Sequence, residues 1–269
     1  MGLLRGRGIW AVPVSLLSVG LALGSGIRSP SLPDPPRADQ LPAGAVGIAV
    51  LGVPSAPHGR MALHPPLVLP ARGPYGARSD RRYLPVYQRP HDPFPRIDID
   101  TENPLGQRFR LPVRTIERDP DGSAWLRVLL PGAQLGRTGW VRSDDIHVVT
   151  LTDRLVVDLS SFTLRHYRNG RLIDTFRVGV GRPEFPTPTG TYFIWARVPE
   201  GMPDGPYGVF ALGTSAFSSV IEDGRVGIHG TANPADRGQR VSHGCIRVYN
   251  TDMVKLEHVP LGTPLIIRG

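Results

Sequence analysis

The chain has very little of two reactive residue types, cysteine and lysine. Its 269 residues include one cysteine, Cys245, and one lysine, Lys255, although lysine and arginine together number 31. A single cysteine excludes an intramolecular disulfide framework, a zinc finger and a CxxC redox pair. Composition alone leaves two interpretations of Cys245 open, a buried inert thiol or a reactive one.

The chain also lacks a concentrated region of positive charge. Its formal net charge is +8, but residues 1–24, 25–80, 81–150 and 151–269 each carry a net charge of +2. Proteins that bind nucleic acid concentrate basic residues on one face, because phosphate neutralisation is local. We therefore expect no nucleic-acid partner, and at most a mild attraction to an acidic one.

The N-terminal apolar run is shorter than the roughly 20 residues that a membrane-spanning helix needs. Arg5 and Arg7 precede the uncharged run Ile9–Gly24, and the small residues Gly24-Ser25-Gly26 end it. This order is typical of a secretory signal. We predict a signal peptide or membrane anchor over residues 1–24, and hence an extracytoplasmic protein, periplasmic or associated with the cell wall.

Residues 25–80 show no sustained helical or strand period. The stretch holds 11 prolines and a single apolar patch, Leu41–Val53, which could form one short strand. Proline-rich composition of this kind favours an extended spacer. We predict a Pro-rich linker over 25–80.

Residues 81–149 predict a small all-β module, because short apolar runs alternate with turn residues. Asp119-Pro120-Asp121-Gly122 is a turn sequence, and Trp125 and Trp140 are expected in the core. The segments around Trp125 and Gly139–Val141 resemble the Src-homology-like β modules found beside bacterial cell-wall enzymes. The expected strands are Tyr83–Tyr87, Gln107–Ile116, Trp125–Leu130 and one that begins at Gly139.

Residues 151–268 predict a mainly antiparallel, β-sandwich-like domain with one short helix. Asn169-Gly170 between two alternating runs is a strong hairpin signal, since both central residues of a type I′ turn need positive φ. Thr251 is placed to cap a helix that runs to about His258. The Gly- and Pro-rich stretch Pro199–Val226 is expected to be a loop. The expected strands are Leu155–Leu159, Phe162–Arg168, Leu172–Val180, Tyr192–Val198, Val226–Ile228 and Thr263–Ile267.

The lone cysteine stands in the most informative stretch of the chain. Its segment is Ser242-His243-Gly244-Cys245-Ile246-Arg247, and His229-Gly230-Thr231 lies upstream at the end of a predicted strand. A thiolate nucleophile needs a proton acceptor within reach, amide donors for the oxyanion, and cationic neighbours that favour the thiolate. Two histidines and one cysteine would also suit zinc, but no fourth ligand is evident. We expect a catalytic thiol and no metal.

These two motifs resemble those of the L,D-transpeptidase catalytic domain family (YkuD-like). The resemblance covers roughly residues 151–268 and includes the turn Thr187-Pro188-Thr189-Gly190. It implies an enzyme that cross-links the peptide stems of bacterial peptidoglycan without a cofactor. Cys245 would attack the L-centre carbonyl of the third residue of a donor tetrapeptide stem and release D-Ala. The side-chain amine of an acceptor stem would then take the acyl group, giving a 3-3 cross-link.

The resemblance also implies roles for the neighbouring residues. His229 would be the general base, oriented by the backbone carbonyl of Gly230, and the amides of His243, Gly244 and Cys245 would form the oxyanion hole. Ser242 and Thr231 belong to the same oxyanion and substrate region. Arg247 would either fix the turn or bind a substrate carboxylate. We expect a monomer, with the 81–149 module available for contact with glycan.

Two other functions stay open at the level of sequence. A cysteine peptidase or L,D-carboxypeptidase would use the same residues and let water resolve the acyl-enzyme. A non-catalytic wall-binding protein would leave Cys245 without a chemical role.

Overall fold

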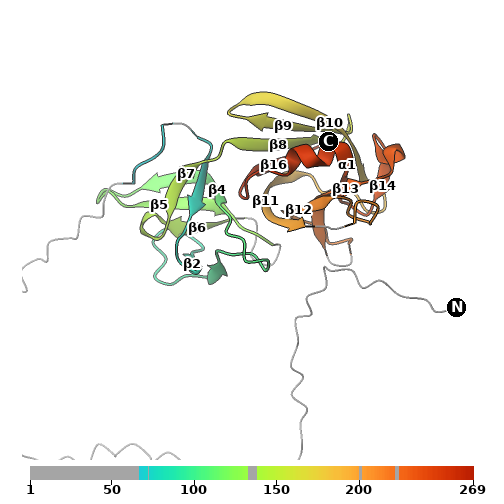
Figure 1. Ribbon diagram of the computed structural model, residues 1–269. Helices are drawn as coiled ribbons and strands as arrows, with labels where there is room; N and C mark the ends of the chain where they lie inside the picture. The colour runs from blue at the N-terminus through green and yellow to red at the C-terminus, as the bar shows by residue number, and fades with distance from the viewer. Residues whose placement is uncertain (1–66, 72, 133–137, 200–201, 222–223) are drawn as a thin grey trace, which may run out of the picture. The chain divides into compact units, whose positions relative to one another are not determined.

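The structure is a computed structural model and describes residues 67–71, 73–132, 138–199, 202–221 and 224–269. The predicted signal or anchor over 1–24 and the apolar patch Leu41–Val53 lie outside the described residues. The described chain is mostly β-structure with one short α-helix (Figure 1), which confirms the predicted fold class.

The N-terminal module is an antiparallel sheet with a separate two-stranded hairpin. The five-stranded sheet has the order β6-β5-β4-β1-β7, and β2 pairs with β3. Trp125 is buried in this module, as expected, and its ring meets the edge of Tyr87. The strands are β1 (Tyr75–Arg78), β2 (Tyr83–Val86), β3 (Ile97–Asp100), β4 (Leu111–Arg118), β5 (Ala124–Leu129), β6 (Thr138–Arg142) and β7 (His147–Thr150).

The first strand of the module lies inside the stretch that the sequence assigned to the linker. β1 pairs with both β4 and β7, so the predicted boundary at residue 80 is too late. The strand has only four residues, YGAR, and follows Pro70 and Pro74. It is too short to show alternation, and its partners lie far along the chain.

The C-terminal part is a sandwich of two sheets that share two long strands. One half of β10 pairs with β9 and the other half with β15, and β11 likewise pairs with both β16 and β12. Its strands are β8 (Asp153–Asp158), β9 (Thr163–Arg168), β10 (Arg171–Gly181), β11 (Gly190–Pro199), β12 (Phe210–Phe217), β13 (Arg225–Thr231), β14 (Arg240–Ser242), β15 (Ile246–Tyr249) and β16 (Pro264–Arg268). The core between the sheets includes Leu155, Leu164, Ile194, Leu212, Ile228 and Ile246.

The hairpin between β9 and β10 is confirmed, with positive φ at both Asn169 and Gly170. The sheets are not purely antiparallel, because β8–β16, β13–β15 and β10–β14 are parallel pairs. Parallel strands are connected through other elements rather than by a tight turn, so no local turn sequence predicts their pairing.

Two local predictions are wrong. The stretch Pro199–Val226 contains the strand β12, whose sequence FALGTSAF alternates small and apolar residues rather than polar and apolar ones. The helix α1 (Asn250–Met253) continues as a 3₁₀ turn, Val254–Leu256, and its N-cap is Tyr249 without a side-chain cap. Thr251 lies within the helix because β15 leads directly into it.

Strand β11 joins the module to the sandwich, since it is buried on both faces. Tyr192 and Ile194 pack in the sandwich core, whereas Phe193 and Trp195 pack against the module around Phe109. The module also supplies side-chain hydrogen bonds to the β11 backbone. Asn103 Nδ2 donates to Trp195 O at 2.8 Å, and Gln107 Nε2 donates to Arg197 O at 2.7 Å.

A buried charged cluster closes one end of the β8–β9 pair. The Asp153 carboxylate accepts hydrogen bonds from Thr152 Oγ1 at 2.6 Å and from Arg168 Nε at 3.1 Å, and lies 2.6 Å from His166 Nε2. Burial alone would raise the pKa of the Asp153 carboxyl, but these hydrogen bonds outweigh it and hold the pKa below its usual value. The cluster therefore stabilises the fold while Asp153 is ionised.

We expect Asp153→Asn to lower the free energy of unfolding at pH 7 by about 1–3 kcal/mol, because an amide cannot accept all three bonds. A carboxyl whose folded pKa is lowered contributes stability above its unfolded pKa and loses it as the pH falls. The difference between the two proteins should thus shrink below about pH 3.8. Urea unfolding measures it, with Asp174→Asn, at a more exposed ion pair with Lys255, as the control. An equal loss in both variants would contradict this role of the cluster.

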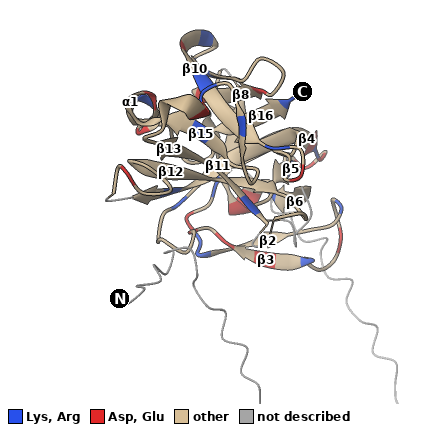
Figure 2. Ribbon diagram, turned by 90° about the vertical axis from the view of Figure 1, so that its right-hand side faces the viewer, with Lys and Arg blue, Asp and Glu red and all other residues tan. Residues whose placement is uncertain are grey.

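Charge is dispersed over the described residues. Basic and acidic segments alternate along the elements rather than gathering in one block of one sign (Figure 2). No helix among the described residues is long and apolar enough to cross a membrane.

Candidate active site

The predicted nucleophile and base lie at a parallel strand pair. β13 and β15 pair with Ile228 beside Ile246 and His229 beside Arg247. Both isoleucines are fully buried in the sandwich core. Because side chains alternate along a strand, His229 and Arg247 lie on the opposite face. Cys245 directly precedes Ile246, the first residue of β15, and its thiol accepts from Gly227 N–H of β13. Residues 16 apart in sequence thus become near neighbours.

The thiol of Cys245 is partly exposed and held by the neighbouring strand. Gly227 N–H donates to Cys245 Sγ at 3.4 Å. Gly227 in turn stands beside Gly213 of β12, so neither position adds a side chain to the face on which the thiol lies. A backbone donor at the sulfur favours the charged thiolate over the thiol.

His229 is buried and has one defined tautomer. Its Nδ1 lies 2.9 Å from the Gly230 carbonyl oxygen, which can only accept, so Nδ1 carries the proton. Nε2 is therefore the basic nitrogen. Burial lowers the pKa of His229 to about 4, the hydrogen bond to Gly230 opposes this shift, and the Arg247 charge adds to it. The ring is neutral at pH 7 and able to accept a proton.

The turn that carries the cysteine is braced from two sides. Ser242 Oγ donates to Cys245 O at 2.6 Å and accepts from Gly244 N at 3.1 Å. Thr187, in the predicted Thr-Pro-Thr-Gly turn, donates to Gly244 O at 2.8 Å and accepts from Gly181 N. The Gly244 amide, expected at the oxyanion position, is thus engaged by Ser242 in this structure. Ser242 is buried and acts as a brace.

Gly244 must be glycine at this turn. Its φ is +110°, and a Cβ there would lie 2.5 Å from Ile221 Cδ1. The turn therefore excludes any side chain next to the thiol.

Arg247 and Thr231 meet at a buried aspartate that the sequence analysis did not single out. Asp236 Oδ2 accepts from Thr231 Oγ1 at 2.9 Å and from Arg247 Nη1 at 3.2 Å, and Asn233 Nδ2 donates to its other oxygen. Of the two roles considered for Arg247, this ion pair favours fixing the turn. The segment Asn233-Pro234-Ala235-Asp236 is itself a capped 3₁₀ turn, and that capping signal could have pointed to Asp236.

A loop packs over His229 because Gly208 and Gly230 let the two backbones approach closely. A Cβ on Gly230 would lie 2.4 Å from Asn250 Oδ1 and 2.9 Å from Val209 N. Asn250 accepts from Val209 N and donates to Pro203 O, which fastens the loop to α1. The loop brings the Tyr207 ring edge-on to His229, with centroids 5.3 Å apart. Gly230 therefore serves both the tautomer of His229 and the approach of this loop.

Comparison with known proteins identifies the family. Residues 152–267 match the family model described as the L,D-transpeptidase catalytic domain, YkuD. The chain is 36% identical over 146 residues to a Bacillus licheniformis protein that carries the name L,D-transpeptidase YkuD, covering 54% of this chain and 76% of that one. A Bacillus subtilis protein of the same name is 37% identical over 120 residues, covering 44% and 68%. The chain belongs to the YkuD family of L,D-transpeptidases.

An L,D-transpeptidase from Mycobacterium smegmatis aligns with 16% identity and a TM-score of 0.38, covering 59% of this chain and 99% of that one. Membership of the YkuD family makes this chain a transpeptidase-type acyltransferase related to peptidoglycan processing.

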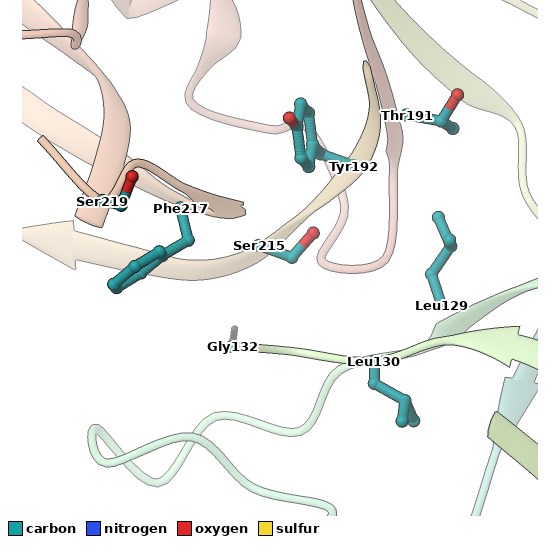
Figure 3. A pocket seen from close by; sticks show the side chains of 8 residues that line it. All are labelled: Leu129, Leu130, Gly132, Thr191, Tyr192, Ser215, Phe217 and Ser219. Carbon is teal, nitrogen blue, oxygen red and sulfur yellow. The ribbon is translucent and has the colours of Figure 1, made fainter. Parts of the chain in front are cut away.

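A separate cavity of about 230 Å³ lies away from these residues. It is lined by Leu129, Leu130, Gly132, Thr191, Tyr192, Ser215, Phe217 and Ser219 (Figure 3), and none of the predicted site residues lines it. No group of three or more His, Cys, Asp or Glu side chains in the described ranges is placed to hold a metal ion.

Proposed function

We propose that this YkuD-family protein is an L,D-transpeptidase that uses Cys245 as its nucleophile and forms 3-3 cross-links between peptidoglycan stems. The observation that supports the proposal is the β13–β15 pair, because the Gly227 amide of β13 donates to the thiol of Cys245. His229, a neutral histidine with a single tautomer, lies two residues further along the same strand. A structural cysteine would need neither a basic nitrogen beside it nor a glycine turn.

The first step forms a thioester. Cys245 Sγ bonds to the L-centre carbonyl carbon of the third residue of the donor stem, while His229 Nε2 takes the thiol proton. The bond from that carbon to the D-Ala nitrogen then breaks, and His229 returns the proton to the leaving amine. The products of this step are free D-Ala and the acyl-enzyme.

The second step transfers the acyl group. The side-chain amine of an acceptor stem attacks the thioester carbon, and His229 accepts a proton from that amine. The C–S bond breaks as the new amide bond forms, and the proton returns to Cys245. Water as the acceptor would instead give an L,D-carboxypeptidase.

Both steps pass through an oxyanion that amide donors must stabilise. The His243 and Cys245 amides are the donors that we assign to it, because Gly244 N–H is engaged by the Ser242 hydroxyl. The brace of Ser242 and Thr187 would hold this turn in one conformation during both steps.

The proposed substrate, peptidoglycan, implies where the protein acts and what it binds. Peptidoglycan stems are cross-linked outside the cytoplasmic membrane, so an export signal or anchor over residues 1–24 fits this function. Glycan contact through the β module remains a prediction.

Purified tetrapeptide muropeptides test the proposed function directly. We expect equimolar release of D-Ala and formation of a stem dimer, followed by mass spectrometry, and a covalent mass shift of the intact protein with a carbapenem-type β-lactam. Release of D-Ala without any dimer would replace transfer by hydrolysis. Absence of both D-Ala and the adduct would contradict a reactive thiolate.

A further inference from the structure

Arg182 is fastened to the turn that carries Cys245. It follows the last residue of β10, and its backbone N–H donates to Ser242 O at 3.1 Å. The preceding residue, Gly181, donates to Thr187 Oγ1, and the same hydroxyl donates to Gly244 O. Backbone contacts therefore hold Arg182 and the nucleophile turn together.

The guanidinium of Arg182 packs against two rings beside the nucleophile. Its Nη2 donates to His243 Nε2, and its Cζ lies 5.2 Å from the centre of the Phe185 ring. The rings of Phe185 and His243 meet edge-on at 4.9 Å. Since a guanidinium can only donate, His243 Nε2 is the acceptor in this contact. The two rings restrict the guanidinium before any ligand arrives, which reduces the entropy lost on binding.

The two arginines at the turn differ in their charge balance. Arg247 pairs with the buried carboxylate of Asp236. Arg182 pairs with no carboxylate of the described residues, and its buried Nε has no hydrogen-bond acceptor among them. The charge of the Arg182 guanidinium is therefore not balanced by a described carboxylate, which suits its Nη groups to an anionic ligand.

We propose that Arg182 binds the terminal carboxylate of the donor stem, that of the D-residue released on acylation. This inference rests on the proposed function. The carboxylate lies only three bonds beyond the scissile carbonyl carbon, and His243 lies two residues before the nucleophile. A guanidinium matches a carboxylate in a two-bond geometry. A terminal carboxylate is also the group that distinguishes the end of a stem from an internal peptide bond, so Arg182 would select the terminal residue.

The test compares two donor tetrapeptides, one ending in D-Ala and one in D-alaninamide. We expect wild type to prefer the acid by about 10- to 100-fold in kcat/KM, mostly through KM, since one charge-assisted interaction is removed. Arg182→Gln should reduce this preference to near one, and Arg182→Lys should restore part of it. The control, Arg171→Gln at the exposed start of β10, should keep the full preference.

The other outcomes overturn either the inference or the proposed function. If Arg182→Gln slows both donors equally, Arg182 is structural and the inference is wrong. If the preference depends instead on the side-chain carboxylate of the third residue, tested by amidating that group, Arg182 binds a different carboxylate. If wild type releases product from neither donor, the proposed function fails and this inference fails with it. Alkylation of Cys245 by uncharged iodoacetamide and the unfolding midpoint report whether each variant keeps an intact site.

Discussion

Cys245→Ala abolishes D-Ala release and stem dimer formation, with a fall in kcat/KM of at least about 1,000-fold, because no other group on that face can form the thioester. The substitution removes the weak hydrogen bond from Gly227 N–H, and should change the free energy of unfolding by less than about 1 kcal/mol. Activity is measured by D-Ala release, and folding by urea denaturation.

The same variant separates the enzyme from a wall-binding protein. Binding of Cys245→Ala to isolated peptidoglycan should match that of wild type, and its mass should not change with a carbapenem. Full D-Ala release by Cys245→Ala would mean that the nucleophile has been misassigned.

His229→Gln lowers kcat/KM for acylation by about 10²–10⁴-fold, the usual contribution of a positioned base. It also removes the acid limb of the pH profile. Because burial lowers the pKa of His229 to about 4, the wild-type rate should fall to half near pH 4, well below the ordinary value of 6.5. Initial rates between about pH 3 and pH 8 measure both effects.

The stability of the fold has to be followed across the same range. The unfolded chain protonates His229 near pH 6.5 and the folded chain near pH 4, so the unfolded state binds more protons in between. The free energy of unfolding therefore falls as the pH is lowered from about 6.5 to about 4, and this contribution is absent in His229→Gln. An acid limb centred near pH 6.5 would contradict the buried, neutral histidine.

The sequence points to the candidate catalytic residues of this site but not to the residues that support them. Local motifs indicate Cys245, His229 and the glycines beside them, because the turn around a nucleophile needs small residues within a few positions of it. Asp236 and Arg182 reach the turn only through β-pairing between distant segments. No periodicity in the sequence reveals that Arg247 is neutralised and that Arg182 is not paired with a described carboxylate.

In the fold, too, features that depend on local sequence are predicted, and features that depend on distant segments are missed. Asn169-Gly170 predicts its hairpin because the turn chemistry is local. β1 and β12 are missed, since one has four residues and the other alternates small with apolar side chains. Such strands are stabilised by their neighbours in the sheet, and tertiary context overrides their weak intrinsic preference.

Strand β11 makes the sandwich of this protein dependent on the N-terminal module. The family match begins at residue 152, but a chain that began there would leave Phe193 and Trp195 facing water and the β11 carbonyls without Asn103 and Gln107. Loss of the module would therefore expose an apolar patch on the sandwich itself. In this chain, a substitution in either part that alters the contacts of β11 therefore has to be accommodated by the other part.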